Sequence, residues 1–249
     1  MKNIRGSICI ATVTFVSCVA LWATPGDTLS SFPTPGRCPT GLAYDNETLW
    51  LADRLSDSLY AIDCASGEVK RAIPAPGFIP LGLAWDGECL WCIDGEENRI
   101  YRIDIESGIT LKSFESPTSQ AQGLAWDGES LWLSDDRDDI IAKISTDDGT
   151  TIVSFASPSR SPQGLAWDGK YLWCADRIQD RIYMVETTGG EVLLSLDAPG
   201  KYARGLAWRD GALWNVDYQD DRLYSLVVDD GDITACLHPF FQYRRRVIC

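Results

Sequence analysis

The protein has 249 residues, of which 22 are Lys or Arg, 36 are Asp or Glu, and one is His. Its hydrophobic share of 45% and charged share of 23% are typical of a globular chain and exclude a disordered one. The formal charge of −14 argues against nucleic acid or an anionic membrane as a partner, because phosphate groups are held by clustered Lys and Arg. A single His excludes a metal site built from several imidazoles.

The first 23 residues differ from the rest and predict a secretory signal peptide. Lys2 and Arg5 form a short basic start, and residues 7–23 carry no charge. We therefore expect a mature chain without a membrane span that is secreted, periplasmic or held at the cell surface. An uncleaved anchor and a lipid anchor at Cys18 are the alternatives.

Seven cysteines follow the leader, and an odd number leaves at least one unpaired in an oxidising compartment. Cys89 and Cys92 have the CxxC spacing of redox and zinc motifs. However, the repeat pattern described next places them on or beside a strand, where residues three apart point to opposite faces. We expect them to be buried and to act as small apolar side chains.

A glycine followed by Leu, Ala and an aromatic residue recurs five times at intervals of 41 residues. Counted from that glycine, offset 9 is always Trp, offset 12 is always Asp and offset 26 is always Gly. Offsets 3 and 9 together account for nine of the ten Trp. The chain is therefore an array of five repeats, whose first positions are Gly41, Gly82, Gly123, Gly164 and Gly205.

Each repeat predicts four short strands separated by turn residues. Asp86-Gly87 is a strong hairpin signal, and a four-residue loop there would set Trp85 opposite Leu90 and Ala84 opposite Trp91. Four-stranded units of about 40 residues that stack around an axis are the blades of an all-β β-propeller. In the second repeat the expected strands are residues 83–85, 90–93, 100–103 and 110–114.

An additional strand is predicted before the first repeat. Phe32 lies 41 residues before Ile73, so residues 26–35 match the fourth strand of a repeat. We expect this orphan strand to close a five-bladed ring, although residues 233–237 also resemble a fourth strand and leave an incomplete six-bladed ring as the alternative. The expected division is a signal peptide at 1–23, the closing strand at 24–40, the five-repeat propeller at 41–245 and a tail at 246–249.

The run Gly82-Leu-Ala-Trp-Asp-Gly, with Leu90-Trp-Cys-Ile-Asp94 and Asn98-Arg99-Ile100, resembles the NHL-type propeller repeat. It is similar also to the Trp-rich, YVTN-like repeats of exported bacterial and archaeal proteins. The resemblance covers residues 26–237 and implies the architecture alone, because such repeats serve binding modules, gluconolactonase-type lactonases and antibiotic lyases. Five blades also resemble plant-type glutaminyl cyclases, but no repeat carries a distinctive Glu, Asn and Lys set.

The positions that vary between repeats predict a binding face. Ligands of propellers usually meet the loops that precede the first strand and the loops that join the second and third strands. Offsets −1 and 13 lie in these loops, and their residues are mostly polar and vary between repeats, whereas the residues that define the repeat do not vary. The alternative explanation is the sequence variation that surface loops tolerate without any role in binding. The expected binding residues are Thr40, Arg54, Gln122, Asp136, Gln163, Arg177, Arg204 and Tyr218.

Acidic loops such as residues 135–139 and 217–221 offer oxygen ligands for calcium. The acidic pattern recurs in every repeat without an alternating ligand run, so we expect turn-forming bonds to the backbone and no cofactor, with a divalent cation as the alternative. Asn215 breaks the apolar pattern at offset 10 and needs a partner, either the closing strand or a ligand in the channel.

The uniform repeats contain no Ser/His/Asp or Cys/His arrangement, and we assign no catalytic residue. The favoured hypothesis is an exported, monomeric, non-enzymatic propeller that binds a protein, peptide or glycan through its polar loops. The alternative is a small-molecule enzyme of the lactonase, lyase or glutaminyl cyclotransferase kind, with its site in the central channel. A purely structural surface-layer element is a third possibility.

Overall fold

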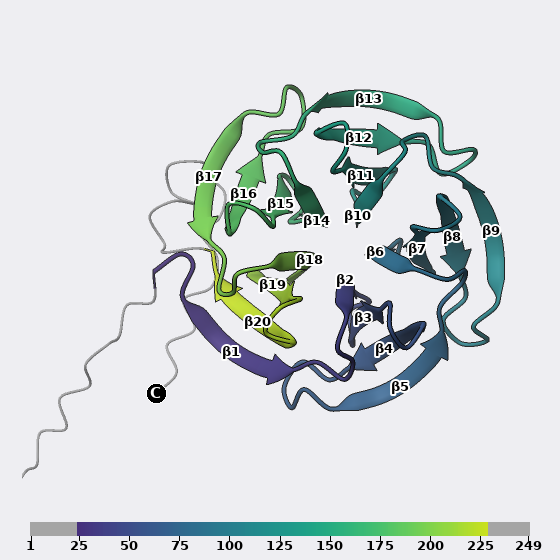
Figure 1. The fold of residues 1–249 in the computed structure, drawn as a ribbon, viewed down its shortest axis with the longest axis horizontal. Helices are drawn as coiled ribbons and strands as arrows, with labels where there is room; N and C mark the ends of the chain where they lie inside the picture. Colours follow the sequence, from purple (N-terminus) through teal and green to yellow (C-terminus); the bar gives the residue numbers. More distant parts are fainter. Residues whose placement is uncertain (1–23, 229–249) are drawn as a thin grey trace, which may run out of the picture.

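The computed structural model describes residues 24–228 as five four-stranded antiparallel sheets arranged in a ring (Figure 1). The predicted five-bladed β-propeller is therefore confirmed. The predicted leader, residues 233–237 and the tail lie outside the described residues. Among residues 24–228 no helix is long and apolar enough to cross a membrane.

The blades follow the chain order and each begins at the axis. Blade 1 contains β2 (Pro39–Tyr44), β3 (Leu49–Asp53), β4 (Ser58–Ile62) and β5 (Val69–Pro74). Blade 2 contains β6 (Pro80–Trp85), β7 (Leu90–Asp94), β8 (Arg99–Ile103) and β9 (Thr110–Glu115). Blade 3 contains β10 (Ala121–Trp126), β11 (Leu131–Asp135), β12 (Ile140–Ile144) and β13 (Thr151–Ala156). Blade 4 contains β14 (Pro162–Trp167), β15 (Leu172–Asp176), β16 (Arg181–Val185) and β17 (Val192–Asp197).

Blade 5 joins the two ends of the described chain. It contains β18 (Ala203–Arg209), β19 (Ala212–Asp217), β20 (Arg222–Val227) and, as its outermost strand, β1 (Thr28–Pro33). β1 pairs with β20, and the ring of Phe32 stacks on Trp214 with centroids 6.4 Å apart. The ring therefore closes with five blades, and the six-bladed alternative is wrong. The first strand of blade 1, β2, begins at Pro39, two residues before the repeat glycine Gly41.

The first hairpin of each blade has the register expected from the sequence. Trp85 lies opposite Leu90, and Ala84 lies opposite Trp91. Asp86 closes this hairpin, because its carboxylate accepts the Cys89 amide at 2.7 Å and the Trp91 indole N–H at 2.8 Å. The same indole-to-carboxylate bond forms in three other blades, in the pairs Asp45 and Trp50, Asp127 and Trp132, and Asp168 and Trp173.

The cysteines of the CxxC pair are buried, as expected. Cys89 is 2% exposed and Cys92 is fully buried in β7, and all five cysteines of the described part are free thiols. Burial raises the pKa of Cys92 and of Cys174 well above the usual range of a thiol. These thiols are structural rather than reactive.

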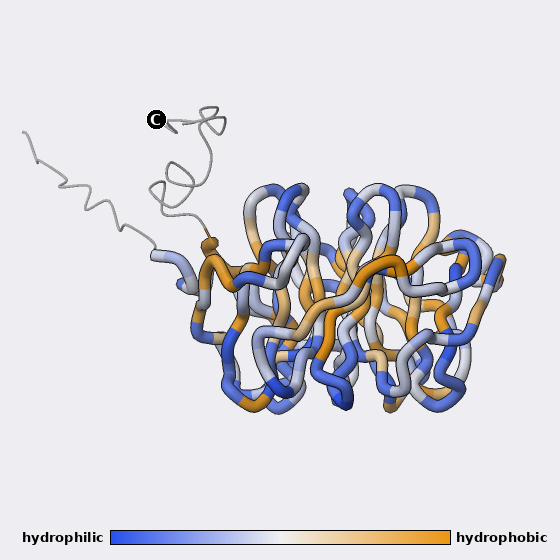
Figure 2. The backbone as a smooth tube through the Cα atoms, turned by 90° about the horizontal axis from the view of Figure 1, so that it is seen from above, coloured by the Kyte–Doolittle hydropathy of each residue, from blue (hydrophilic) through white to orange (hydrophobic). Residues whose placement is uncertain are grey.

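The repeat glycines set the width of the channel. A Cβ atom at Gly41 would clash with the backbone of Leu81, and one at Gly164 would clash with the backbone of Arg204 in the next blade. Only glycine permits such close approach of the inner strands. Seen from the side, the apolar strands form the middle layer and hydrophilic loops cover both faces of the ring (Figure 2).

Candidate functional site

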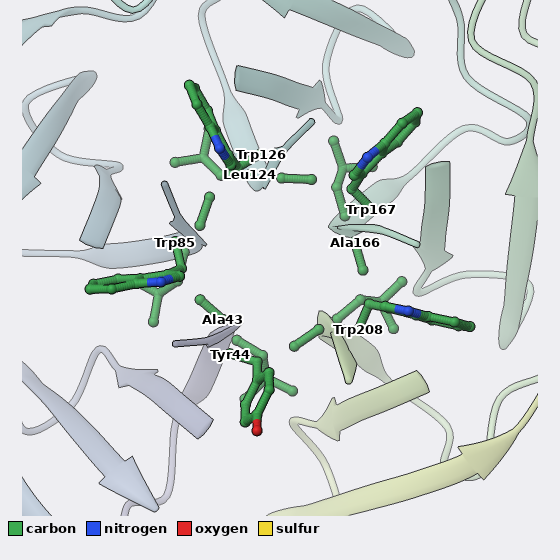
Figure 3. Close-up of a pocket in the computed structure, with 15 residues that line it drawn as sticks. Ala43, Tyr44, Trp85, Leu124, Trp126, Ala166, Trp167 and Trp208 are labelled. Atoms are coloured by element: carbon green, nitrogen blue, oxygen red, sulfur yellow. The ribbon is translucent and has the colours of Figure 1, made fainter. Parts of the chain in front are cut away.

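The two faces of the ring differ in chemistry. The hairpin face carries the turns between the first and second strands, and its channel end is a cavity of about 80 Å³ lined by Leu, Ala and aromatic residues. Figure 3 shows Trp85, Trp126, Trp167, Trp208 and Tyr44 pointing away from the axis. The side chains at this end therefore offer few polar groups to a ligand.

The opposite face, here called the loop face, is organised by the Asp at offset 12. Asp94 accepts the amides of Phe78 and Ile79, both at 2.6 Å, and the amide of Glu97 at 2.7 Å. It thereby ties the loop before β6 to the loop after β7. The equivalent aspartates are all fully buried, which confirms the expected turn-forming role. Within residues 24–228 no group of three or more His, Cys, Asp or Glu is arranged to hold a metal ion.

Three of the predicted binding residues meet at the carboxylate of Asp136. Its oxygens accept the side-chain amides of Gln122 and Gln163, both at 3.3 Å. The guanidinium of Arg177 lies 3.6 Å from the same carboxylate. Burial raises the pKa of Asp136, although the Gln163 hydrogen bond and the charge of Arg177 oppose that shift.

Arg204 extends across the channel mouth. It lies in blade 5, and its Nη1 is 3.4 Å from Oε1 of Gln122 in blade 3, so the side chain passes the intervening blade 4. Its guanidinium lies 5.6 Å from the ring centroid of Tyr202 and 5.4 Å from that of Tyr218. The residue is 8% exposed, and burial lowers the pKa of Arg204. Its Nε has no hydrogen-bond partner within the described part of the chain.

The remaining arginines surround the same tyrosine pair. Arg54 Nη2 lies 3.4 Å from the hydroxyl of Tyr218, and its guanidinium packs over that ring at 5.5 Å. Arg177 donates to Ser161 Oγ at 2.7 Å and to the hydroxyl of Tyr202 at 3.2 Å. Seven of the eight predicted residues thus belong to one continuous network that spans four blades.

The eighth predicted residue, Thr40, lies apart from this network. It is buried, and its hydroxyl donates to the carbonyl of Pro80 at 2.8 Å in the next blade. Thr40 therefore joins neighbouring blades and presents no free group at the mouth.

Three residues of the loop face were missed. Tyr202 and Ser161 bond Arg177, and Cys38 Sγ lies 3.7 Å from the hydroxyl of Tyr218. All three occupy offset −3, where the repeats vary as they do at offset −1. That variation is the signal that could have identified them, and the full set is Cys38, Ile79, Gln120, Ser161 and Tyr202.

The expected pairing of Asn215 with the closing strand is wrong. Asn215 is fully buried in β19, and its amide donates to the carbonyls of Gly205 and Val216, both at 3.2 Å. Gly205 lies in β18, the innermost strand of the blade, whereas β1 is the outermost strand. The polar side chain therefore fixes the inner strand.

The comparisons place the protein among propellers without selecting an activity. The sequence matches no family model and no curated protein. The fold is similar to that of Myxococcus xanthus glutaminyl cyclase, at 14% identity over 82% of this chain and 96% of that one, with a TM-score of 0.71. Virginiamycin B lyase from Staphylococcus aureus is 20% identical over 80% and 69% of the two chains, with a TM-score of 0.51. A chain of the nidogen/laminin complex is 18% identical over 76% of both chains, with a TM-score of 0.58. These likenesses show a β-propeller repeat protein, and the fold is shared by enzymes and binding proteins alike.

Proposed function

We propose that the protein is an exported, NHL-like or YVTN-like binding module whose loop face captures the anionic group of a protein, peptide or glycan. This function requires the chain to be secreted, periplasmic or surface-held, as its leader suggests. The ligand would meet the channel mouth, where the side chains vary most between repeats.

One observation carries this proposal: the network contains three guanidinium groups but one carboxylate. Arg54, Arg177 and Arg204 are gathered there, whereas Asp136 is the acidic group outside the turn-forming set. Guanidinium groups match the geometry of carboxylates and of other oxyanions, and partial burial strengthens such bonds. An excess of positive charge at this place is notable in a chain of net charge −14.

Further cations surround the mouth on the same blades. Offset −4 is basic and exposed in blades 1, 4 and 5, which are the blades that supply the three arginines. Blades 2 and 3 have neither a Lys nor an Arg at offsets −4, −1 and 13. The positive charge at these offsets thus lies in one sector of the loop face, which is suited to attract and orient an anion. The basic residues at offset −4 are Arg37, Arg160 and Lys201.

The tyrosine pair gives this sector a fixed shape. Tyr202 and Tyr218 pack with centroids 5.3 Å apart, and each ring lies under two of the arginines. Arginines held against aromatic rings lose less side-chain freedom when a ligand binds. The site is therefore organised before the anion arrives.

Calorimetric titration of the mature chain with sulfate and with succinate tests the proposal. We expect both anions to bind to the parent. In the double variant Arg54→Gln/Arg177→Gln, we expect the affinity for each anion to fall about tenfold or more. Lys170→Gln removes an exposed positive charge from the hairpin face and is the matched control, with unchanged affinity expected. Equal affinity in all three proteins would contradict the proposal. The enzymatic alternative predicts turnover of a small molecule instead.

A further inference from the structure

The channel mouth has two unlike sides. Blades 4, 5 and 1 form the cationic sector described above, with both tyrosines. Blade 2 presents Phe78, Ile79, Leu81 and Gly95 at the matching positions, so these positions are apolar, while the exposed Glu96 and Glu97 follow Gly95 in the same loop. Figure 1 shows β6 of blade 2 across the axis from β14 of blade 4 and β18 of blade 5, which are two of the three blades of the cationic sector. A ligand that fills the mouth therefore touches charge on one side and hydrocarbon on the other.

The apolar side is open to a ligand at Phe78. This side chain is 65% exposed, and two other large apolar side chains in loops of the same face, Leu55 and Ile178, are exposed to a similar degree. At Gly95 the other blades carry a long or charged side chain, and a Cβ there would lie 2.8 Å from Cδ1 of Leu81. Leu81 thus occupies the space that a polar side chain would use. Phe78, an exposed aromatic residue in the loop just before the strand that contains Leu81, is suited to contact an apolar group of a ligand.

A groove leads outward from the cationic side. It has a volume of about 600 Å³ and lies between the loops of blades 4 and 5. Lys201 and Gln219 line it, and they directly adjoin Tyr202 and Tyr218 of the mouth. Three aspartates, Asp180, Asp197 and Asp220, also line the groove and make it acidic. Its other lining residues include Gln179 and Gly200, which offer side-chain amide and backbone groups. Such groups suit the hydrogen bonds of an extended peptide backbone.

We infer that the ligand is a peptide with a free C-terminal carboxylate and an apolar last side chain. The carboxylate pairs with the guanidinium groups of Arg54, Arg177 and Arg204. The last side chain lies against Phe78, and the preceding residues leave through the groove. This inference rests on the proposed function and adds the identity of the anion and the direction of the chain.

Two observations favour this ligand over an inorganic anion or an acidic sugar. Sulfate and phosphate satisfy the arginines but leave the apolar side unused. A sugar acid carries hydroxyl groups that the side chains of Phe78, Ile79 and Leu81 cannot pair with, and unpaired hydroxyls there would cost binding energy. The C-terminus of a peptide combines a carboxylate for the arginines, an apolar last side chain for blade 2 and a chain long enough to follow the groove.

Fluorescence anisotropy with labelled hexapeptides tests the inference. We expect a peptide ending in leucine to bind about tenfold more tightly as the free acid than as the C-terminal amide, because the amide loses a charge-assisted bond. The free acid ending in serine is also expected to bind about tenfold more weakly. N-Acetyl-leucine, which cannot reach the groove, should compete only weakly with the hexapeptide.

The variants separate the two sides of the mouth. Phe78→Ser is expected to weaken the leucine peptide and leave the serine peptide and sulfate unchanged, while Lys170→Gln changes none of them. Equal binding of acid and amide, or of leucine and serine peptides, would overturn the inference even if sulfate binding still depends on the arginines. Loss of that sulfate dependence would instead overturn the proposed function itself.

Discussion

Arg204 in blade 5 reaches Gln122 in blade 3, with Nη1 and Oε1 3.4 Å apart across the mouth of the channel. The two residues are 82 positions apart in the chain, and blade 4 lies between them. A buried guanidinium usually pairs with a carboxylate, because an unpaired buried charge is costly. Here the guanidinium has an amide oxygen and two aromatic rings instead, which leaves its charge available to an anion.

This arrangement predicts the effect of Arg204→Gln. We expect the affinity for sulfate to fall about tenfold or more, because a charge-assisted bond is lost. The free energy of unfolding should stay within about 1 kcal/mol, because the variant also removes an incompletely paired buried charge. Calorimetry and thermal unfolding measure the two effects. Unchanged sulfate affinity with a large loss of stability would show that Arg204 is purely structural.

Asp136 competes with the ligand for the same arginines. In Asp136→Asn this internal carboxylate is gone, and we expect sulfate to bind about threefold to tenfold more tightly. Asp138→Asn, which changes an exposed acid in the same loop, is the matched control and should have little effect. Weaker binding in Asp136→Asn would mean that the carboxylate positions the arginines rather than competing.

The same carboxylate predicts a dependence on pH. Since the folded-state pKa of Asp136 is raised, the folded protein holds a proton that the unfolded chain has already released between the two pKa values. Its contribution to stability therefore decreases as pH rises through that interval, and sulfate affinity decreases with it. In titrations from about pH 4 to pH 7, the stability and the sulfate affinity of the parent, each taken relative to Asp136→Asn, should decrease as pH rises. Parallel profiles in the two proteins would contradict this assignment.

Closure of the ring predicts a specific role for Phe32. Its ring stacks on Trp214, and Phe32→Ala should lower the free energy of unfolding by about 2 kcal/mol, because the side chain is only partly buried. Leu29→Ala in the same strand is the control, since Leu29 is 59% exposed and its loss should cost little. Denaturant unfolding of the two variants measures the difference. Equal stability would mean that β1 closes the ring through its backbone alone.

The hairpin residue Asp127 predicts loss of stability in acid. Burial opposes ionisation of Asp127, but the bonds from Lys143, the Ser130 amide and the Trp132 indole hold its pKa below the ordinary value. Its stabilising effect is therefore complete above the unfolded pKa and is lost as pH falls through the lower folded pKa. Asp127→Asn should cost about 1 to 3 kcal/mol at neutral pH, whereas the exposed Glu129→Gln should cost little. Chemical denaturation at pH 7 compares the two, and equal stabilities would contradict the role.

The sequence predicted the parts of the fold that repeat. The 41-residue period fixed the strands, and the Asp86-Gly87 turn fixed the register of Ala84 against Trp91. These features depend on contacts within one blade, and the residues that make those contacts are close together in the chain. The local sequence pattern therefore predicts them. Closure by residues near Phe32 followed from the same period, but the start of β2 at Pro39 did not, because strand pairing extends beyond the repeat glycine.

The candidate site was predicted less completely. Offsets −1 and 13 identified the residues that line the mouth, because variable positions stand out against a constant scaffold. The contact between Arg204 and Gln122 joins two blades, and no periodicity records which long side chains cross a channel. Tyr202 was missed because offset −3 was not considered. Thr40 was included, although its hydroxyl donates a hydrogen bond to the carbonyl of Pro80 in the next blade.

The most direct test of the account is the affinity of the mature chain for sulfate, measured by calorimetry at low and at physiological ionic strength. The account predicts binding that weakens with salt, that falls about tenfold or more in Arg54→Gln/Arg177→Gln, and that persists in Lys170→Gln. Binding that is the same in both variants, or absent from the parent at low salt, would contradict an anion site on the loop face.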